Sequence, residues 1–234
     1  MMVMRNIKAV FSKQIKETIK NKTVLIQFLM FPVITIVMNC AVHMADMPEN
    51  FFTELFAVMY VGMAPIVVTS TIVAEEKEKG TLKALMMSGV RPFEYLFGIG
   101  SYIWISCMIG SIVIVLSGTY NTSSVLIFLL FMAVGIIISM LMGAAVGIRS
   151  HSQMSATSVS VPLMMVFAFL PMLAMFNDTI EKIAKFTYTR QLQLMLSSLT
   201  GSGVGISNWL IIIGNGLIVL FLFAWAYKKD GLES

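Results

Sequence analysis

The chain has 234 residues, of which 58% are hydrophobic and 12% are charged, and its mean hydropathy is +0.87. Soluble domains average about 25% charged residues, so this composition excludes an ordinary soluble protein and indicates an integral membrane protein. The formal net charge of +4 comes from lysines and arginines in short segments beside apolar runs. This is a membrane-topology pattern, so no nucleic-acid partner is expected.

Residues 1–23 are predicted to form a basic amphipathic helix. Met4, Ile7, Phe11 and Ile15 fall on one helical stripe, and the lysines of the segment lie largely off it. Such a helix is expected to lie in the cytoplasmic membrane interface, where anionic lipid attracts it. The segment lacks the apolar core of a cleavable signal peptide.

Six apolar runs follow, each close to the roughly 20 residues that cross a hydrocarbon core of about 30 Å. They cover residues 24–43, 55–74, 95–117, 125–148, 156–176 and 209–227. Because these runs are continuous rather than alternating, they predict transmembrane helices and not the strands of a barrel. The predicted fold class is therefore an all-α membrane protein, with a six-span domain over 24–227 and a tail over 228–234.

The distribution of basic residues predicts the orientation of the spans. Of the 16 lysines and arginines, all but Lys182, Lys185 and Arg190 fall before residue 23, in the loops 75–94 and 149–155, or after residue 227. The positive-inside rule therefore places both termini in the cytoplasm.

The segment 177–207 is long for a connection between two spans. Two short amphipathic helices are expected in it, around residues 180–187 and 192–199, lying on or dipping into the outer leaflet. A joint formed by Gly201, Gly203 and Gly205 is expected to lead into the last span.

Small residues recur every fourth position in the fourth span, at Ser139, Gly143 and Gly147. Such a ladder lets two helices approach closely. Packing within the subunit is the expected use of this face, and a contact with a second copy is the alternative.

The loop between the second and third spans carries an ordered charge pattern, EEKEKGTLKALMMSGVRP. Glu75 and Lys79 can pair at i,i+4, so the second helix is expected to extend into the cytoplasm. Gly80 is expected to end it, and Thr81 to N-cap a short new helix that ends before Gly89.

An apolar face is predicted on this short helix. Leu82, Leu85 and Met86 share one side of it. An apolar face on a charged cytoplasmic segment suits insertion into the groove of a partner protein. The alternative is a solvated loop whose charge pattern has no partner.

This loop resembles the cytoplasmic elbow of type-2 ABC exporter permeases, particularly the drug and antibiotic exporter branch. The matching residues are Glu75, Glu76, Lys77, Glu78, Gly80, Thr81, Leu85 and Ser88. Lys83 and Gly89 depart from the family pattern, which often has an acid and a proline there. The entry to the first span, KNKTVLIQFLMFPVITIV, and the six-span layout are also similar, so the resemblance covers the whole chain.

The resemblance implies a permease subunit in a bacterial-type cell membrane that pairs with a second permease copy, identical or homologous, and with two cytoplasmic ATPase subunits. The segment of about 75–92 would be the coupling helix. The residues expected to contact the ATPase are Glu75, Glu76, Glu78, Gly80, Thr81, Leu82, Leu85 and Met86. Spans one, two and five would line the translocation path, and its candidate polar residues are Asn39, Tyr60, Thr69, Ser70, Ser158 and Ser160.

The chain itself is not expected to be an enzyme. It contains no Gly-Lys dipeptide and therefore no P-loop, so ATP and magnesium are expected only in the partner ATPase. The six apolar runs contain no Asp, Glu, Lys or Arg to act as an intramembrane base. Cys40 and Cys107 form neither a disulfide framework nor a metal spacing.

The expected function is export of a peptide, a drug or another amphipathic cargo by alternating access, driven by the separate ATPase. Two alternatives remain open from the sequence. One is a membrane immunity or sensor subunit that anchors an ATPase without transport, and the other is an exporter of lipid or glycolipid.

Overall fold

The fold is described from a computed structural model that covers residues 2–42, 48–200 and 205–230. These residues form helices and contain no strand, which confirms the all-α fold class. Six helices are long and apolar enough to cross a membrane. They are α2 (Lys22–Ala41), α3 (Phe51–Glu78), α5 (Pro92–Leu116), α6 (Thr122–Arg149), α7 (Gln153–Ala174) and α10 (Ile206–Asp230).

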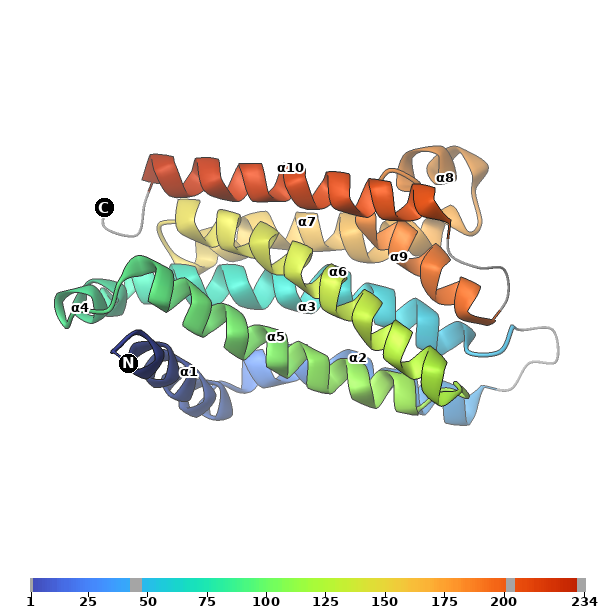
Figure 1. Cartoon of the computed structure of the whole chain (residues 1–234), viewed down its shortest axis with the longest axis horizontal. Coiled ribbons are helices and arrows are strands. Elements are labelled where there is room, and N and C mark those ends of the chain that lie inside the picture. Colours follow the sequence, from blue (N-terminus) through green and yellow to red (C-terminus); the bar gives the residue numbers. More distant parts are fainter. Residues whose placement is uncertain (1, 43–47, 201–204, 231–234) are drawn as a thin grey trace.

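Shorter helices connect or flank these spans. They are α1 (Met2–Lys20), α4 (Thr81–Met87), α8 (Asp178–Ala184), α9 (Tyr188–Ser197) and the 3-10 turn η1 (Ser198–Thr200). Figure 1 shows the start of α1, the whole of α4 and the last turn of α10 at one end of the bundle, and α8 at the other. The segments rich in lysine and arginine therefore share one end of the molecule.

Two spans begin earlier than the hydropathy of the sequence indicates. α3 starts at Phe51 and includes Glu54, which is buried and accepts a hydrogen bond of 3.3 Å from the Tyr120 hydroxyl. α5 starts at Pro92 and includes Glu94. Proline suits the first position of a helix, where its missing N–H costs no hydrogen bond. These membrane-spanning helices thus carry carboxylates that the apolar runs alone do not contain.

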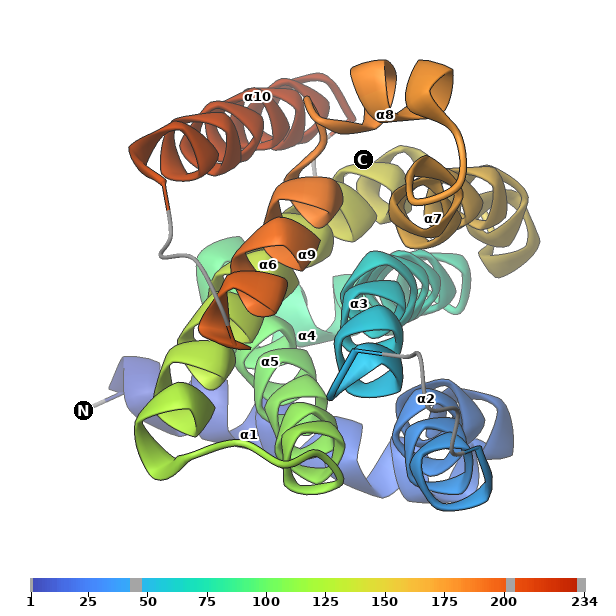
Figure 2. The same ribbon diagram turned by 90° about the vertical axis from the view of Figure 1, so that its right-hand side faces the viewer.

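α3 is the central helix of the bundle. It is buried almost continuously from Thr53 to Ala74. The helices α2, α5, α6, α7 and α9 all pack against it (Figure 2). α10, by contrast, contacts mainly α6 and α9 and leaves most of its surface exposed.

Glycines bring α6 against the backbone of α3. A Cβ added at Gly143 would overlap the carbonyl oxygen of Ile66, and one added at Gly147 would lie 2.8 Å from the carbonyl oxygen of Ser70. The small-residue ladder of the fourth span is therefore used for packing within the chain, as expected. The first residue of the ladder, Ser139, places its hydroxyl 2.7 Å from the hydroxyl of Tyr188 on α9.

The two short helices after α7 differ in their surroundings. α8 leaves Ile183 exposed, and Phe186 just after it is exposed as well. α9 buries Tyr188, Leu192 and Leu196 and packs on α3, α6, α7 and α10. The apolar side of α9 is enclosed by the spans, which is compatible with a helix that dips into the outer leaflet. The expectation that both helices lie on or dip into this leaflet stays a prediction. Of the predicted glycine joint, positions 201 and 203 lie outside the described residues.

Candidate functional site

The candidate site is the junction of α3, α4 and α1 at the basic end of the bundle (Figure 1). α3 ends at Glu78, and Gly80 turns the chain with a left-handed φ of 66°. Gly89, with a φ of 90°, turns it again before α5. Glycine adopts such angles at no steric cost, which explains why it stands on both sides of α4.

Thr81 does not cap α4 as predicted. Gly80 is the residue that precedes the helix, and Thr81 already belongs to its first turn. The Thr81 hydroxyl donates instead to the carbonyl oxygen of Glu76 at 3.1 Å. The left-handed turn at Gly80 fixes this register, and the hydroxyl then ties α4 back to the last turn of α3.

The predicted apolar face of α4 points into the protein. Leu82 is 1% exposed and belongs to the hydrophobic core, and Leu85 and Met86 pack against the same core. The expectation that these three side chains offer a face to a partner is therefore wrong for Leu82. The outward side of α4 carries Lys83 and Met87, and Met87 is 89% exposed.

The three glutamates of the junction each have a partner within the chain. Glu75 accepts from Lys79 one turn later, and this hydrogen bond raises the pKa of the Lys79 amine. Glu78 accepts from the backbone N–H of Gln153 at 2.7 Å, at the start of α7. The third, Glu76, is 5% exposed and faces α1. The glutamates therefore organise the junction itself, although all three were expected to contact the ATPase.

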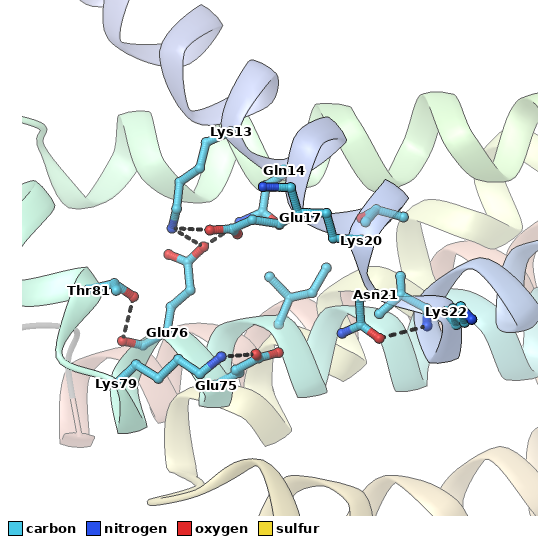
Figure 3. Close-up of a pocket in the computed structure, with 13 residues that line it drawn as sticks. Lys13, Gln14, Glu17, Lys20, Asn21, Lys22, Glu75, Glu76, Lys79 and Thr81 are labelled. Carbon is cyan, nitrogen blue, oxygen red and sulfur yellow. Dashed lines mark hydrogen bonds and ion pairs between the residues drawn. The ribbon is translucent and has the colours of Figure 1, made fainter.

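Glu76 joins α3 to α1. Its carboxylate accepts a hydrogen bond of 2.8 Å from the Lys13 amine and another from the Gln14 amide (Figure 3). Nearer the start of α1, Asn6 donates to the Glu94 carboxylate of α5 at 2.8 Å. Two carboxylates on two spans thus hold one surface helix in place.

The buried side of α1 differs from the stripe predicted for it. Val10, Gln14 and Thr18 are buried, whereas Met4 and Ile15 are exposed. The reason is that Asn6 and Gln14 of α1 donate hydrogen bonds to the buried carboxylates of Glu94 and Glu76. A pattern of apolar residues alone does not reveal these contacts. The exposed apolar residues of α1 remain free to contact lipid.

The candidate path residues do not converge within one chain. Tyr60, Ser70 and Ser160 are fully buried, Thr69 is 4% exposed and Ser158 is exposed on α7. Thr69 lines a hollow of about 140 Å³ that contains none of the others.

The sixth candidate, Asn39, lies near the end of α2 away from the α4 junction. Its amide donates to the Thr53 hydroxyl at 2.9 Å and to the carbonyl and hydroxyl oxygens of Ser117 at 3.1 and 3.0 Å. Asn39 therefore fastens α2 to α3 and α5 in this arrangement. Among the described residues, no three His, Cys, Asp or Glu side chains come together in a way that could hold a metal ion.

The comparisons with known proteins agree with the architecture. The family model described as "ABC-2 family transporter protein" matches residues 3–227, which include α4, the first five spans and nearly all of α1 and α10. A search of curated proteins finds no match. Because the family model matches nearly the whole chain, this protein belongs to the ABC-2 family of transporter proteins.

Proposed function

We propose that this protein is the permease subunit of an ATP-driven exporter that moves a peptide, a drug or another amphipathic cargo out of the cell. Membership of the ABC-2 family makes it a multi-pass ABC transporter permease, and the family implies an association with an ABC ATPase. The proposal adds the direction of transport, the class of cargo, two ATPase subunits and a second permease copy.

The attachment of α4 to α3 carries the proposal. α4 stands at the end of the most buried helix of the bundle, and Leu82 fixes it to the core while Met87 and Lys83 face outward. A force applied to α4 is therefore transmitted to α3, around which the other spans pack. Such a connection suits a membrane protein whose spans change arrangement when a neighbouring subunit moves.

The ATPase is proposed to bind the outward side of α4. Covering the exposed Met87 side chain would contribute about 1.5–3 kcal/mol, which makes it the natural anchor of a groove-binding helix. This end of the molecule also carries the basic segments. One of these basic residues, Arg149, makes a cation–π contact there, with its guanidinium carbon 4.5 Å from the centroid of the Trp225 ring. We place this end, with both termini, in the cytoplasm.

The cargo path is proposed to lie between two copies of the chain. The candidate path residues do not share a cavity within one chain, and Ser158 points outward from α7. α2 and α7 also leave large apolar side chains exposed, including Leu29, Val33 and Met165. Walls of this kind suit an apolar or amphipathic molecule.

Co-purification with the ABC ATPase tests the docking. Met87→Asp should abolish recovery of the ATPase, since it places a charge on the exposed anchor without disturbing the core. Met154→Asp is the matched control, because Met154 is 81% exposed at the same end of the bundle and lies outside α4. Full recovery of the ATPase with a combined Lys83→Glu and Met87→Asp variant would remove α4 from the docking surface.

Reconstitution in vesicles tests the energy source and the direction. Outward movement of a fluorescent amphipathic cargo should require the ATPase and ATP together. Movement by the permease alone would contradict the proposal. Cargo-stimulated ATP hydrolysis without any movement would favour a sensor or immunity role instead.

A further inference from the structure

The last turn of α3 contacts three different helices through three consecutive side chains. Glu76 accepts hydrogen bonds from α1, as Figure 3 shows. The Lys77 amine donates to the carbonyl oxygen of Ile148, near the end of α6, at 3.0 Å. The Glu78 carboxylate accepts from the backbone N–H of Gln153, the first residue of α7, at 2.7 Å. Because consecutive residues of a helix point about 100° apart, one turn of α3 reaches α1, α6 and α7.

The charges of Lys77 and Glu78 match the helix ends that they contact. The last carbonyl groups of a helix and its first N–H groups have no partner within the helix itself. The carbonyl end carries a partial negative charge and the N–H end a partial positive charge, so a lysine suits the end of α6 and a glutamate the start of α7. The two side chains therefore cap two helices to which they do not belong.

A short turn joins the two helix ends that Lys77 and Glu78 contact. Residues 150–152 separate α6 from α7, and Figure 1 shows this α6–α7 turn at the same end of the bundle as α4. The hydroxyl groups of Ser150 and Ser152 form hydrogen bonds back to α6 and α7, respectively. Lys77 and Glu78 thus attach both sides of the turn to α3.

α4 is attached to the same turn of α3. It begins at Thr81, three residues after Glu78, and the Thr81 hydroxyl donates to the carbonyl oxygen of Glu76. A displacement of α4 therefore moves the last turn of α3, and with it the side chains of Lys77 and Glu78. Lys77 is half-buried and Glu78 is exposed, so both can be replaced without opening the hydrophobic core.

We propose that Lys77 and Glu78 form a clamp that makes the α6–α7 turn follow the movement of α4. The clamp deepens the proposed function and rests on it, since the ATPase docked on α4 supplies the force. Both are positioning residues, which act through the helix ends that they hold. α7 carries Ser158 and Met165 of the proposed cargo path, so the clamp gives α4 a direct connection to that path.

Amide hydrogen exchange of the full-length permease, without its ATPase, tests the clamp. The clamp variant, Lys77→Ala with Glu78→Ala, removes both hydrogen bonds and should speed exchange over residues 150–156 about tenfold. Leu82→Ala loosens α4 at its core anchor and should speed exchange in the same segment by up to the same factor. Added to the clamp variant it should cause no further acceleration, because the α6–α7 turn is then already detached from α4. Should Leu82→Ala fail to fold, Leu85→Ala removes a half-buried contact of α4 and replaces it.

A matched control lies in the same turn of α3. Glu75→Ala with Lys79→Ala removes the same two charges, but from a pair that bonds within the segment itself. This control should leave exchange over residues 150–156 at the wild-type rate. Lys77→Arg with Glu78→Gln keeps one donor and one acceptor and should restore the slow exchange.

Transport measures what the clamp does in the complex. In vesicles that contain the permease and its ATPase, the amount of fluorescent amphipathic cargo moved per ATP hydrolysed should fall about tenfold in the clamp variant. Lys77→Arg with Glu78→Gln should restore this ratio. A change that only weakened the docking of the ATPase would lower transport and hydrolysis together and leave the ratio unchanged.

Four results would overturn the clamp. They are an unchanged exchange rate over residues 150–156 in the clamp variant, equal acceleration in the Glu75 and Lys79 control, further acceleration when Leu82→Ala is added, and an unchanged ratio of cargo to ATP. A wild-type chain that does not recover the ATPase would contradict the proposed docking instead. Exchange in the permease alone would still decide whether α4 and the α6–α7 turn are connected.

Discussion

Removing the Glu76 carboxylate should release α1 from the bundle. In Glu76→Ala, the Gln14 amide, which is 2% exposed, loses its acceptor. A buried polar group left without a partner costs about 1–3 kcal/mol. The Lys13 amine loses a contact of 2.8 Å, but its side chain is 28% exposed and water replaces part of that contact, so this loss adds about 1 kcal/mol or less. The sum is about 1–4 kcal/mol.

Amide hydrogen exchange measures this effect where it acts. If α1 opens as a unit, a loss of about 2 kcal/mol speeds exchange over residues 2–20 about thirtyfold, while α3 keeps its protection. Glu76→Gln should have a smaller effect, because its amide oxygen still accepts from Gln14. Glu17→Ala is the control, because Glu17 also pairs with Lys13, at 3.5 Å, but is half-exposed. Such a surface ion pair contributes about 0.5 kcal/mol or less to the stability.

The reasoning would be refuted if α1 exchanged at the wild-type rate in Glu76→Ala. Such a result would mean that Val10 and its apolar neighbours hold α1 without help from the carboxylate. Equal acceleration in Glu17→Ala would also refute it, because the effect would then follow net charge and not burial.

Three further changes test the packing and the junction. Gly143→Ala should lower the free energy of unfolding by about 1–3 kcal/mol, because its methyl group meets the Ile66 carbonyl. The methyl group of Gly214→Ala meets nothing within 4 Å, so this control should be neutral or up to about 1 kcal/mol stabilising. Thermal unfolding in detergent compares the two variants. Burial raises the pKa of the Tyr188 hydroxyl, which therefore stays protonated beside the Ser139 hydroxyl. Tyr188→Phe should lower the free energy of unfolding by about 1–3 kcal/mol. The loss should be smaller in a Ser139→Ala background, and a double-mutant cycle would measure the difference. Lys79→Gln should lower the free energy of unfolding by at most about 0.5 kcal/mol at neutral pH, because the Lys79–Glu75 pair is exposed. The pKa of Lys79 is raised in the folded state, so the stability that the pair contributes is present at neutral pH and is lost only as the pH rises through that raised value. A pH series of melting temperatures would follow this loss.

Hydropathy alone predicts the six spans of this protein, because each must satisfy its backbone inside an apolar medium. The ends of the spans are less predictable. Glu54 and Glu94 lie in the first turns of α3 and α5, where the helices continue past the apolar residues. A search for apolar runs stops before such carboxylates, although they belong to the same helices.

The packing direction of short segments depends on contacts that are distant in the sequence. Leu82 and Met87 are both apolar residues of a two-turn helix, yet one is buried and the other is almost fully exposed. The turn at Gly80 determines which side of α4 faces the core, and the periodicity of apolar residues does not predict that orientation. From the sequence, Glu76 would be predicted to be a solvated charge. In the structure α1 covers it, and its partner Lys13 lies 63 residues earlier in the chain.

The glycines on either side of α4 have a practical consequence for engineering. An added Cβ at Gly80 or at Gly89 would meet nothing within 4 Å, so only the backbone angles require glycine there. The stretch between them behaves as a cassette that Leu82 anchors from within. If α4 docks the ATPase as proposed, grafting the outer positions of this stretch from another permease should redirect the choice of ATPase while leaving the membrane body intact.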